Sequence, residues 1–173
     1  FGSIDVIVNN GQAIVPSAPV EDTTYENMLA AWQSGTIGSL NYMQAAFPYM
    51  KEQHEGRIIN FASATGMFGI AGQLAYGSNK EALRGLTKIA AKEWGQYGIC
   101  VNVVLPGAES PAAKAWAEKF PEEYQKQVML NPMHRFGDPE GDIAPVVAFL
   151  AGPDSCYYSG QSVIVDGANS IMP

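Results

Sequence analysis

A tyrosine and a lysine at helical spacing are the first candidates for chemistry in this sequence. Tyr76 and Lys80 belong to the segment Tyr-Gly-Ser-Asn-Lys, and residues at this separation lie on one face of a helix. A nearby ammonium favours the ionised form of a phenol, so Lys80 is expected to lower the pKa of Tyr76 from its ordinary value of about 10. A tyrosine tuned in this way acts as a general acid or base near neutral pH. The alternative interpretation is a pair of solvated neighbours on a helix surface.

A serine before this pair could complete a reactive group. Ser63 lies thirteen residues before Tyr76 and follows the apolar run 58–62, which places it at the end of a predicted strand. A hydroxyl there can donate a hydrogen bond to a substrate oxygen as negative charge develops on it. A turn serine or a helix-capping serine is the alternative.

Four apolar runs predict the strands that must position these side chains. They cover residues 4–8, 58–62, 99–105 and 162–166. Helical patterns occur at residues 25–50, 76–97, 111–130 and 142–152, and loops are expected at 12–24 and 63–72. Strands that alternate with helices predict one α/β domain with a mostly parallel sheet, right-handed crossovers and helices on both faces. Uninterrupted apolar runs are typical of strands buried on both faces.

The residues that follow these strands mark the expected ligand site. In a parallel α/β sheet, ligands bind beyond the carboxyl ends of the strands. Those ends carry Asn9-Asn10, Ser63, Pro106-Gly107 and Asp166-Gly167. The sequence therefore predicts that the candidate reactive residues gather at this edge of the sheet.

Five segments in consistent order make the chain resemble a known family. Ser63, Tyr76 and Lys80 resemble the Ser…Tyr-x-x-x-Lys constellation of the short-chain dehydrogenases/reductases. Residues 1–11, 57–63, 101–107 and 135–167 resemble the family's Asn-Asn-Ala-Gly strand, its Gly-x-Ile-Ile-Asn-x-Ser-Ser segment, its Val-Asn-x-x-x-Pro-Gly segment and its closing Asp-Gly-Gly stretch. The resemblance implies a Rossmann-like fold and a nicotinamide-dependent oxidoreductase that acts on a small-molecule alcohol or ketone.

The resemblance also implies a role for each site residue. Tyr76 would pass a proton to or from the substrate oxygen, Lys80 would hold the ribose hydroxyls, and Ser63 would orient the carbonyl. Asn9, Asn10 and Gly11 would stabilise the strand ends and contact the adenosine side of NAD or NADP. Backbone groups of Pro106, Gly107 and Glu109 would hold the nicotinamide carboxamide.

The family's glycine-rich Thr-Gly-x-x-x-Gly-x-Gly turn does not occur in these residues. That turn holds a pyrophosphate at a helix N-terminus. We therefore expect residues 1–173 to be the C-terminal, catalysis-bearing part of a Rossmann-like domain whose N-terminal strands are missing. We also expect this part alone not to bind NAD(H) or NADP(H) tightly. The segment that selects between NAD and NADP is missing with the turn, so both coenzymes stay open.

Smaller departures from the family pattern concern residues around the candidate site. Gly35 occupies the helix position where the family has an asparagine that supports a water relay to the lysine, and Ser34 or Thr36 could substitute for it. Pro111 and Ala168 replace a threonine and a glycine of the family pattern. Such changes leave the three chemical residues in place and weaken the cofactor supports.

Composition excludes several other classes of function. The formal net charge is −7, which disfavours nucleic acid and anionic membrane surfaces as partners. No apolar stretch is long enough to span a membrane, and no signal peptide is visible. With two distant cysteines, a reducing, cytoplasmic location is expected, and both thiols are expected to be buried.

His54 and His134 lie far apart without ligand-spaced partners, so no metal site is predicted. Trp116, Met129 and Met133 could line an apolar pocket or pack a lid.

A catalytically idle module that serves binding or oligomerisation is the rival to an enzyme. The missing phosphate turn and Gly35 favour the module, whereas the intact Ser63, Tyr76 and Lys80 favour the enzyme, which we prefer. In either case the helices at 25–50 and 76–97 are expected to pair across subunits of a homodimer or homotetramer. Ala82, Leu86 and Ala90 are the candidates for the outward row of the second helix.

Overall fold

The computed structural model describes residues 2–171, apart from the side chain of Ala112, and contains the predicted parallel sheet. Four strands lie in the order β1-β2-β3-β4. Their bounds are β1 Val6–Asn9, β2 Gly56–Phe61, β3 Ile99–Pro106 and β4 Ser162–Val165. Neighbouring strands pair in parallel, with Asn9 opposite Asn60 and Phe61 opposite Val104. The carboxyl ends of β1 and β2 therefore meet at one edge, as predicted.

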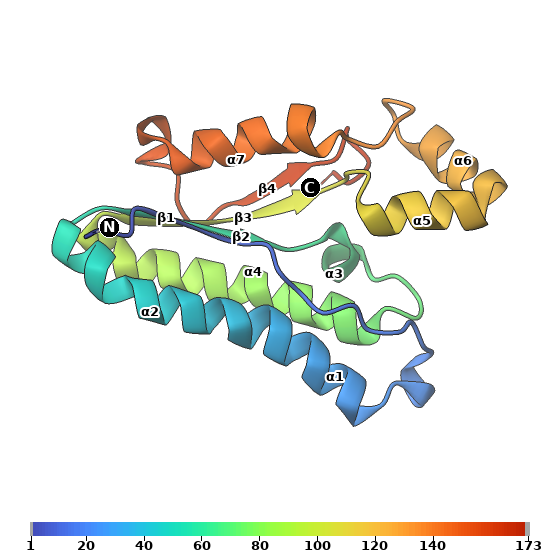
Figure 1. The fold of residues 1–173 in the computed structure, drawn as a ribbon, viewed down its shortest axis with the longest axis horizontal. Helices are drawn as coiled ribbons and strands as arrows, with labels where there is room; N and C mark the ends of the chain where they lie inside the picture. Colours follow the sequence, from blue (N-terminus) through green and yellow to red (C-terminus); the bar gives the residue numbers. More distant parts are fainter. Residues whose placement is uncertain (1, 172–173) are drawn as a thin grey trace.

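Helices cover both faces of this sheet (Figure 1). On one face lie α1 (Tyr25–Trp32), α2 (Gly38–Gln53) and α4 (Leu74–Trp94), and α7 (Ala144–Ala151) lies on the other. Three further helices, α3 (Ala64–Phe68), α5 (Pro111–Lys119) and α6 (Pro121–Leu130), lie beyond the carboxyl ends of the strands. Among the described residues, no helix is both long and apolar enough to cross a membrane.

Two apolar layers hold the central strands. On the α2 and α4 face, Met43 and Met50 pack with Ile58 and Val101, all fully buried. On the α7 face, Ile59 and Val104 pack with Leu150. Successive residues of β2 and β3 thus point into different layers, which explains their uninterrupted apolar runs. Each such side chain contributes about 1.5–3 kcal/mol through burial.

The first strand differs from the prediction of a fully buried strand. Ile7 packs into the core beside α2, but Val6 and Val8 are 38% and 46% exposed. The reason is position, because β1 is an edge strand and α7 packs on β2 rather than on β1. Only one face of β1 is therefore buried.

The helix predicted over 25–50 is divided by a π turn. Gln33–Ile37 separates α1 from α2, and Gly35 lies at its centre. A Cβ atom on Gly35 would lie 2.2 Å from Asn79 Nδ2 of α4. The break thus coincides with a close approach of two distant segments, a contact that local periodicity does not contain.

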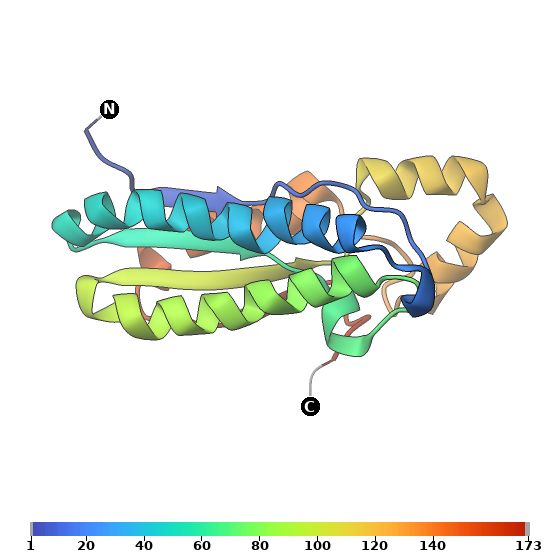
Figure 2. The same cartoon turned by 90° about the horizontal axis from the view of Figure 1, so that it is seen from below.

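The outward row predicted on α4 is wrong for Leu86 and Ala90. Ala90 is buried in the core and Leu86 packs against it, whereas Ile89 is 61% exposed. Figure 2 shows α2 and α4 side by side on the outer face. The large apolar residues that these two helices expose include Ile89 on α4 and Tyr42 and Tyr49 on α2.

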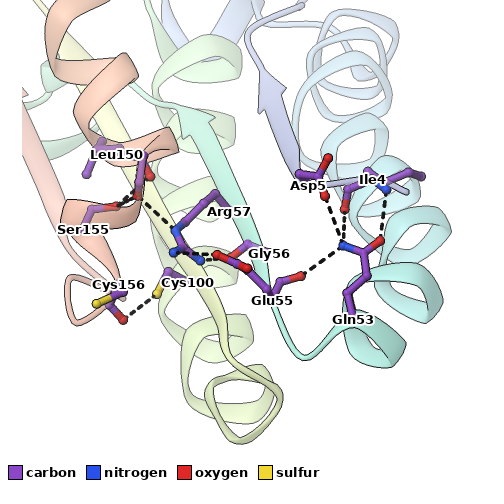
Figure 3. A network of polar contacts seen from close by, with 11 residues as sticks. Ile4, Asp5, Gln53, Glu55, Gly56, Arg57, Cys100, Leu150, Ser155 and Cys156 are labelled. Atoms are coloured by element: carbon purple, nitrogen blue, oxygen red, sulfur yellow. Dashed lines mark hydrogen bonds and ion pairs between the residues drawn. The ribbon is translucent and has the colours of Figure 1, made fainter. Parts of the chain in front are cut away.

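Polar contacts join the amino ends of the strands (Figure 3). The buried Arg57 side chain donates hydrogen bonds to the carbonyls of Gly56 and Gly152, at 3.1 and 3.4 Å, and forms an ion pair with Glu55. The Cys100 thiol donates to the carbonyl of Cys156 at 3.2 Å. Both cysteines are free, and Cys156 is exposed, which corrects the expectation that both thiols are buried.

Candidate active site

Ser63, Tyr76 and Lys80 meet in one cleft beyond the carboxyl ends of β2 and β3. The cleft has a volume of about 300 Å³. We call it the Tyr76 cleft, and it is lined by Asn10, Gln12, Phe61, Ala62, Ser63, Tyr76, Lys80, Pro106, Ala108 and Ser110. The segments that supply these residues are separated in sequence and are brought together by the sheet.

Local structure explains how each reactive side chain is held. Ser63 is the N-cap of α3, and its hydroxyl accepts a hydrogen bond from Thr65 N at 3.2 Å. Tyr76 and Lys80 belong to the first two turns of α4. The Lys80 ammonium lies 5.6 Å from the centre of the Tyr76 ring and donates to the carbonyl of Phe61 at 2.7 Å. The last carbonyl of β2 thereby anchors the lysine at the strand end.

The electrostatics of the pair differ from the expectation that Lys80 lowers the Tyr76 pKa. Burial raises the pKa of Tyr76, and a hydrogen bond with Ser63 offsets part of this rise. Burial also lowers the pKa of Lys80 to about 8. In this arrangement desolvation decides both directions. At neutral pH Tyr76 therefore carries its proton, and most of Lys80 is charged.

The asparagines after β1 have different surroundings. Asn9 Nδ2 donates to Asn60 Oδ1 at 2.8 Å, and Asn60 Nδ2 donates to Thr87 Oγ1 at 2.9 Å. Asn9 thus ties β1 to β2 and α4, which suits the expected role at the strand ends. Asn10 lines the Tyr76 cleft, whereas Gly11 is exposed and is not among the lining residues.

The segment after β3 is shaped by close backbone contacts. A Cβ atom on Gly107 would lie 2.5 Å from Asp166 Cβ, so only glycine fits there. Pro106 lines the Tyr76 cleft and an adjoining apolar cavity of about 570 Å³ beside α7. Glu109 is engaged elsewhere, because its N–H donates to the carbonyl of Gly137 and its carboxylate accepts from the Tyr124 hydroxyl. Ser110, the N-cap of α5, lines the cleft in its place.

Some residues of the cleft were not singled out from the sequence. Phe61 and Ala108 follow directly from the strand ends and could have been found there. Gln12 lies beyond the segment 1–11 that resembles the family, but its amide is buried and has no hydrogen-bond partner among the described residues. An unpaired amide beside Tyr76 is suited to a ligand that offers both a donor and an acceptor.

Ser34 and Thr36, the two candidates to replace the family's helix asparagine, have different hydrogen-bond partners. The Ser34 hydroxyl donates to the carbonyl of Ala30 at 2.6 Å and accepts from Ala13 N. Thr36 instead bonds to Asn79, the residue before Lys80. Of these two residues, Thr36 is the one that reaches α4.

The candidate lid residues do not share one surface. Trp116 packs edge-on against Tyr124, with 5.8 Å between the ring centres, so it joins α5 to α6. Met129 and Met133 are exposed. None of these three side chains lines the Tyr76 cleft, and Trp116 has the packing role. Within the described residues, no group of three or more His, Cys, Asp or Glu side chains could hold a metal ion.

The parallel sheet, with helices on both faces and a cleft at the carboxyl ends of its strands, is a Rossmann-like α/β fold. The family profile described as Enoyl-(Acyl carrier protein) reductase matches residues 1–168. The chain belongs to the short-chain dehydrogenase/reductase family.

Named relatives agree with this assignment. The chain is 41% identical over its full length to 12α-hydroxysteroid dehydrogenase of Clostridium sp., of which it spans 66%. It is 37% identical, over 96% of its length, to 3-oxoacyl-(acyl-carrier-protein) reductase FabG of Thermotoga maritima, and again spans 66% of that protein. The solved structure of ElxO with NADP bound superposes with a TM-score of 0.90 at 29% identity, covering 98% of this chain and 68% of that one. The chain thus spans just under two thirds of both curated relatives.

Proposed function

We propose that the complete protein that carries residues 1–173 is an NAD(P)-dependent oxidoreductase that interconverts a secondary alcohol and a ketone. The observation that carries the proposal is the convergence of Ser63, Tyr76 and Lys80 in one cleft. A rival function as an idle module gives no reason for a buried lysine against a tyrosine, because burying a cation costs free energy.

The side chains suggest how the proton moves. In the reductive direction, the Tyr76 hydroxyl would donate its proton to the substrate oxygen. The Ser63 hydroxyl would bond to the same oxygen and stabilise the charge that develops on it. The Lys80 ammonium, which lies 5.6 Å from the centre of the Tyr76 ring, would stabilise the resulting phenolate. In the oxidative direction the same groups would act in reverse.

The cleft suits the nicotinamide end of a coenzyme. Asn10, Pro106 and Ala108 line it, the buried Gln12 amide has no partner among the described residues, and the Lys80 ammonium has donors beyond the one bonded to Phe61. Bound NAD(H) or NADP(H) would supply or accept the hydride. The NADP bound in the ElxO structure belongs to that protein, and either coenzyme is proposed here.

The substrate is proposed to be a small molecule. The apolar cavity beside Pro106 and α7 adjoins the Tyr76 cleft and could receive an apolar part of a ligand. We also propose that the complete protein forms a homodimer or homotetramer through the outer face of α2 and α4, where Tyr42, Tyr49 and Ile89 are exposed.

Replacement of the Tyr76 hydroxyl tests the proposed function. In the complete protein, Tyr76→Phe is expected to lower turnover by about two to four orders of magnitude, because the phenol transfers the proton. Coenzyme binding is expected to persist, since the ring remains. The measurement is NADH or NADPH consumption with a 12-oxosteroid and with a 3-oxoacyl thioester. Unchanged turnover in the variant would refute the role of Tyr76, and an inactive wild type would favour the idle module.

A further inference from the structure

Asn79 of α4 occupies the side-chain space of Gly35 in the π turn. Asn79 is fully buried, and it directly precedes Lys80. A Cβ atom on Gly35 would lie 2.2 Å from Asn79 Nδ2 and 2.7 Å from its Oδ1, far inside van der Waals contact. The amide therefore fills the position that a side chain at residue 35 would take.

Two donors of Thr36 hold the oxygen of this amide. Thr36 N donates to Asn79 Oδ1 at 2.9 Å, and the Thr36 hydroxyl lies 2.7 Å from the same oxygen. The hydroxyl is also 3.0 Å from the backbone carbonyl of Asn79. Because a backbone N–H can only donate, it identifies the amide oxygen as the acceptor. These contacts fasten the π turn to the catalytic helix one residue before the lysine.

The nitrogen of the amide is buried and has no acceptor among the described residues. Buried N–H groups nearly always have a partner, either a protein group or an ordered water. The Asn79 amide oxygen thus has hydrogen-bond donors while its nitrogen has no acceptor, which distinguishes Asn79 from a side chain that only fills space. It fits an amide that holds the turn with its oxygen and a water with its nitrogen.

We propose that Asn79 is a positioning residue for Lys80: its Oδ1 holds the π turn against α4 at the residue before the lysine, and its Nδ2 binds a buried water. This inference rests on the proposed oxidoreductase function, since Lys80 acts in that reaction. It also makes Gly35 and Asn79 a reciprocal pair, because an amide can come from either position but not from both.

Exchange of the two residues tests the inference in the complete protein. Asn79→Ala is expected to lower kcat by about 10- to 100-fold while KM for coenzyme and substrate changes less than about threefold, because the amide acts on the lysine rather than on ligand binding. Gly35→Asn alone is also expected to lose activity, because of the clash. The double variant Gly35→Asn/Asn79→Ala is expected to recover kcat to within about fivefold of wild type.

Controls separate positioning from general damage. Ser78→Ala, on the same helix but outside the pair, is expected to keep wild-type kcat. Thermal unfolding of every variant reports folding. An Asn79→Ala protein that is less stable but has unchanged kcat would overturn the inference, and so would a folded double variant no better than Asn79→Ala. If Asn79→Ala does not fold, Thr36→Val replaces it, with an expected loss of kcat of about three- to tenfold; unchanged kcat there would equally overturn the inference.

The same measurements separate this inference from the proposed function. An active wild type with an unaffected Asn79→Ala variant would overturn the role of Asn79 alone. A wild type with no nicotinamide-dependent turnover would overturn the proposed function and, with it, the role of Asn79.

Discussion

At the amino ends of the strands, buried polar groups bind one another, whereas at the carboxyl ends several have no protein partner. Arg57 and the buried Ser155 hydroxyl both bond to the carbonyl of Gly152. By contrast, atoms of Gln12, Asn79 and Asp166 are buried without partners among the described residues. An unsatisfied buried polar group costs about 1–3 kcal/mol. The fold thus leaves buried polar groups unsatisfied around the end of the sheet that carries the proposed site, where a ligand or a bound water would complete their hydrogen bonds.

Replacement of the lysine is expected to give the largest effect at the carboxyl end. In Lys80→Met, turnover should fall by about two to four orders of magnitude, because no cation then stabilises the phenolate. The measurement is kcat with the same two substrate classes, with Lys88→Met on the exposed side of α4 as the control. A Lys80→Met protein that retains full kcat would refute the role of Lys80 in the proposed reaction.

The same variant should alter the pH dependence of stability. The folded pKa of Lys80 is about 8, below its ordinary value of 10.5. At a pH between these values, Lys80 is protonated in the unfolded chain but not in the folded chain, so the free energy of unfolding rises with pH across this window. Below the window the lysine is charged in both states, and its burial then lowers the free energy of unfolding most. Denaturant unfolding from about pH 7 to about pH 10.5 should therefore show a shallower rise for Lys80→Met than for wild type. Parallel curves would contradict the lowered pKa.

At the amino ends of the strands, a substitution is expected to lower stability and to leave turnover nearly unchanged. Arg57→Met removes the donors to Gly56 and Gly152 and the ion pair with Glu55. We expect a loss of about 2–4 kcal/mol in the free energy of unfolding, with kcat per folded molecule within about twofold of wild type. Denaturant unfolding and turnover on the same samples give both values. A loss of turnover without a loss of stability would contradict the view that the amino ends of the strands serve stability and the carboxyl ends serve the reaction.

Helix α4 joins both ends and allows a finer test. Ile89, near its last turns, is exposed on the proposed subunit face. Ile89→Lys should weaken assembly measured by light scattering, because it places a charge in an apolar contact. If assembly braces the start of the same helix, kcat should fall several-fold at concentrations where the protein dissociates. A monomer at micromolar concentration with full activity would refute both the interface and its link to catalysis.

The sequence allowed prediction of the features that repeat locally or follow from topology. Apolar runs located all four strands, and the parallel order brought Ser63, Tyr76 and Lys80 to one edge. The π turn was not predictable, because its cause is Asn79, 44 positions from Gly35 in the chain. The five-residue helix α3 is too short for periodicity to reveal. The direction of the Tyr76 pKa shift was also missed, because burial depends on the whole fold while the spacing of Lys80 is local.

The contact between Gly35 and Asn79 also constrains how the protein can evolve. A side chain introduced at residue 35 collides with the amide at 2.2 Å, so position 35 can accept other residues only after position 79 has lost its amide. Loss at position 79 first would leave Thr36 without the oxygen it now binds. Either order passes through an intermediate worse than both end points, which is sign epistasis between neighbouring helices. Lineages that reach this arrangement should therefore change the two positions together or keep both.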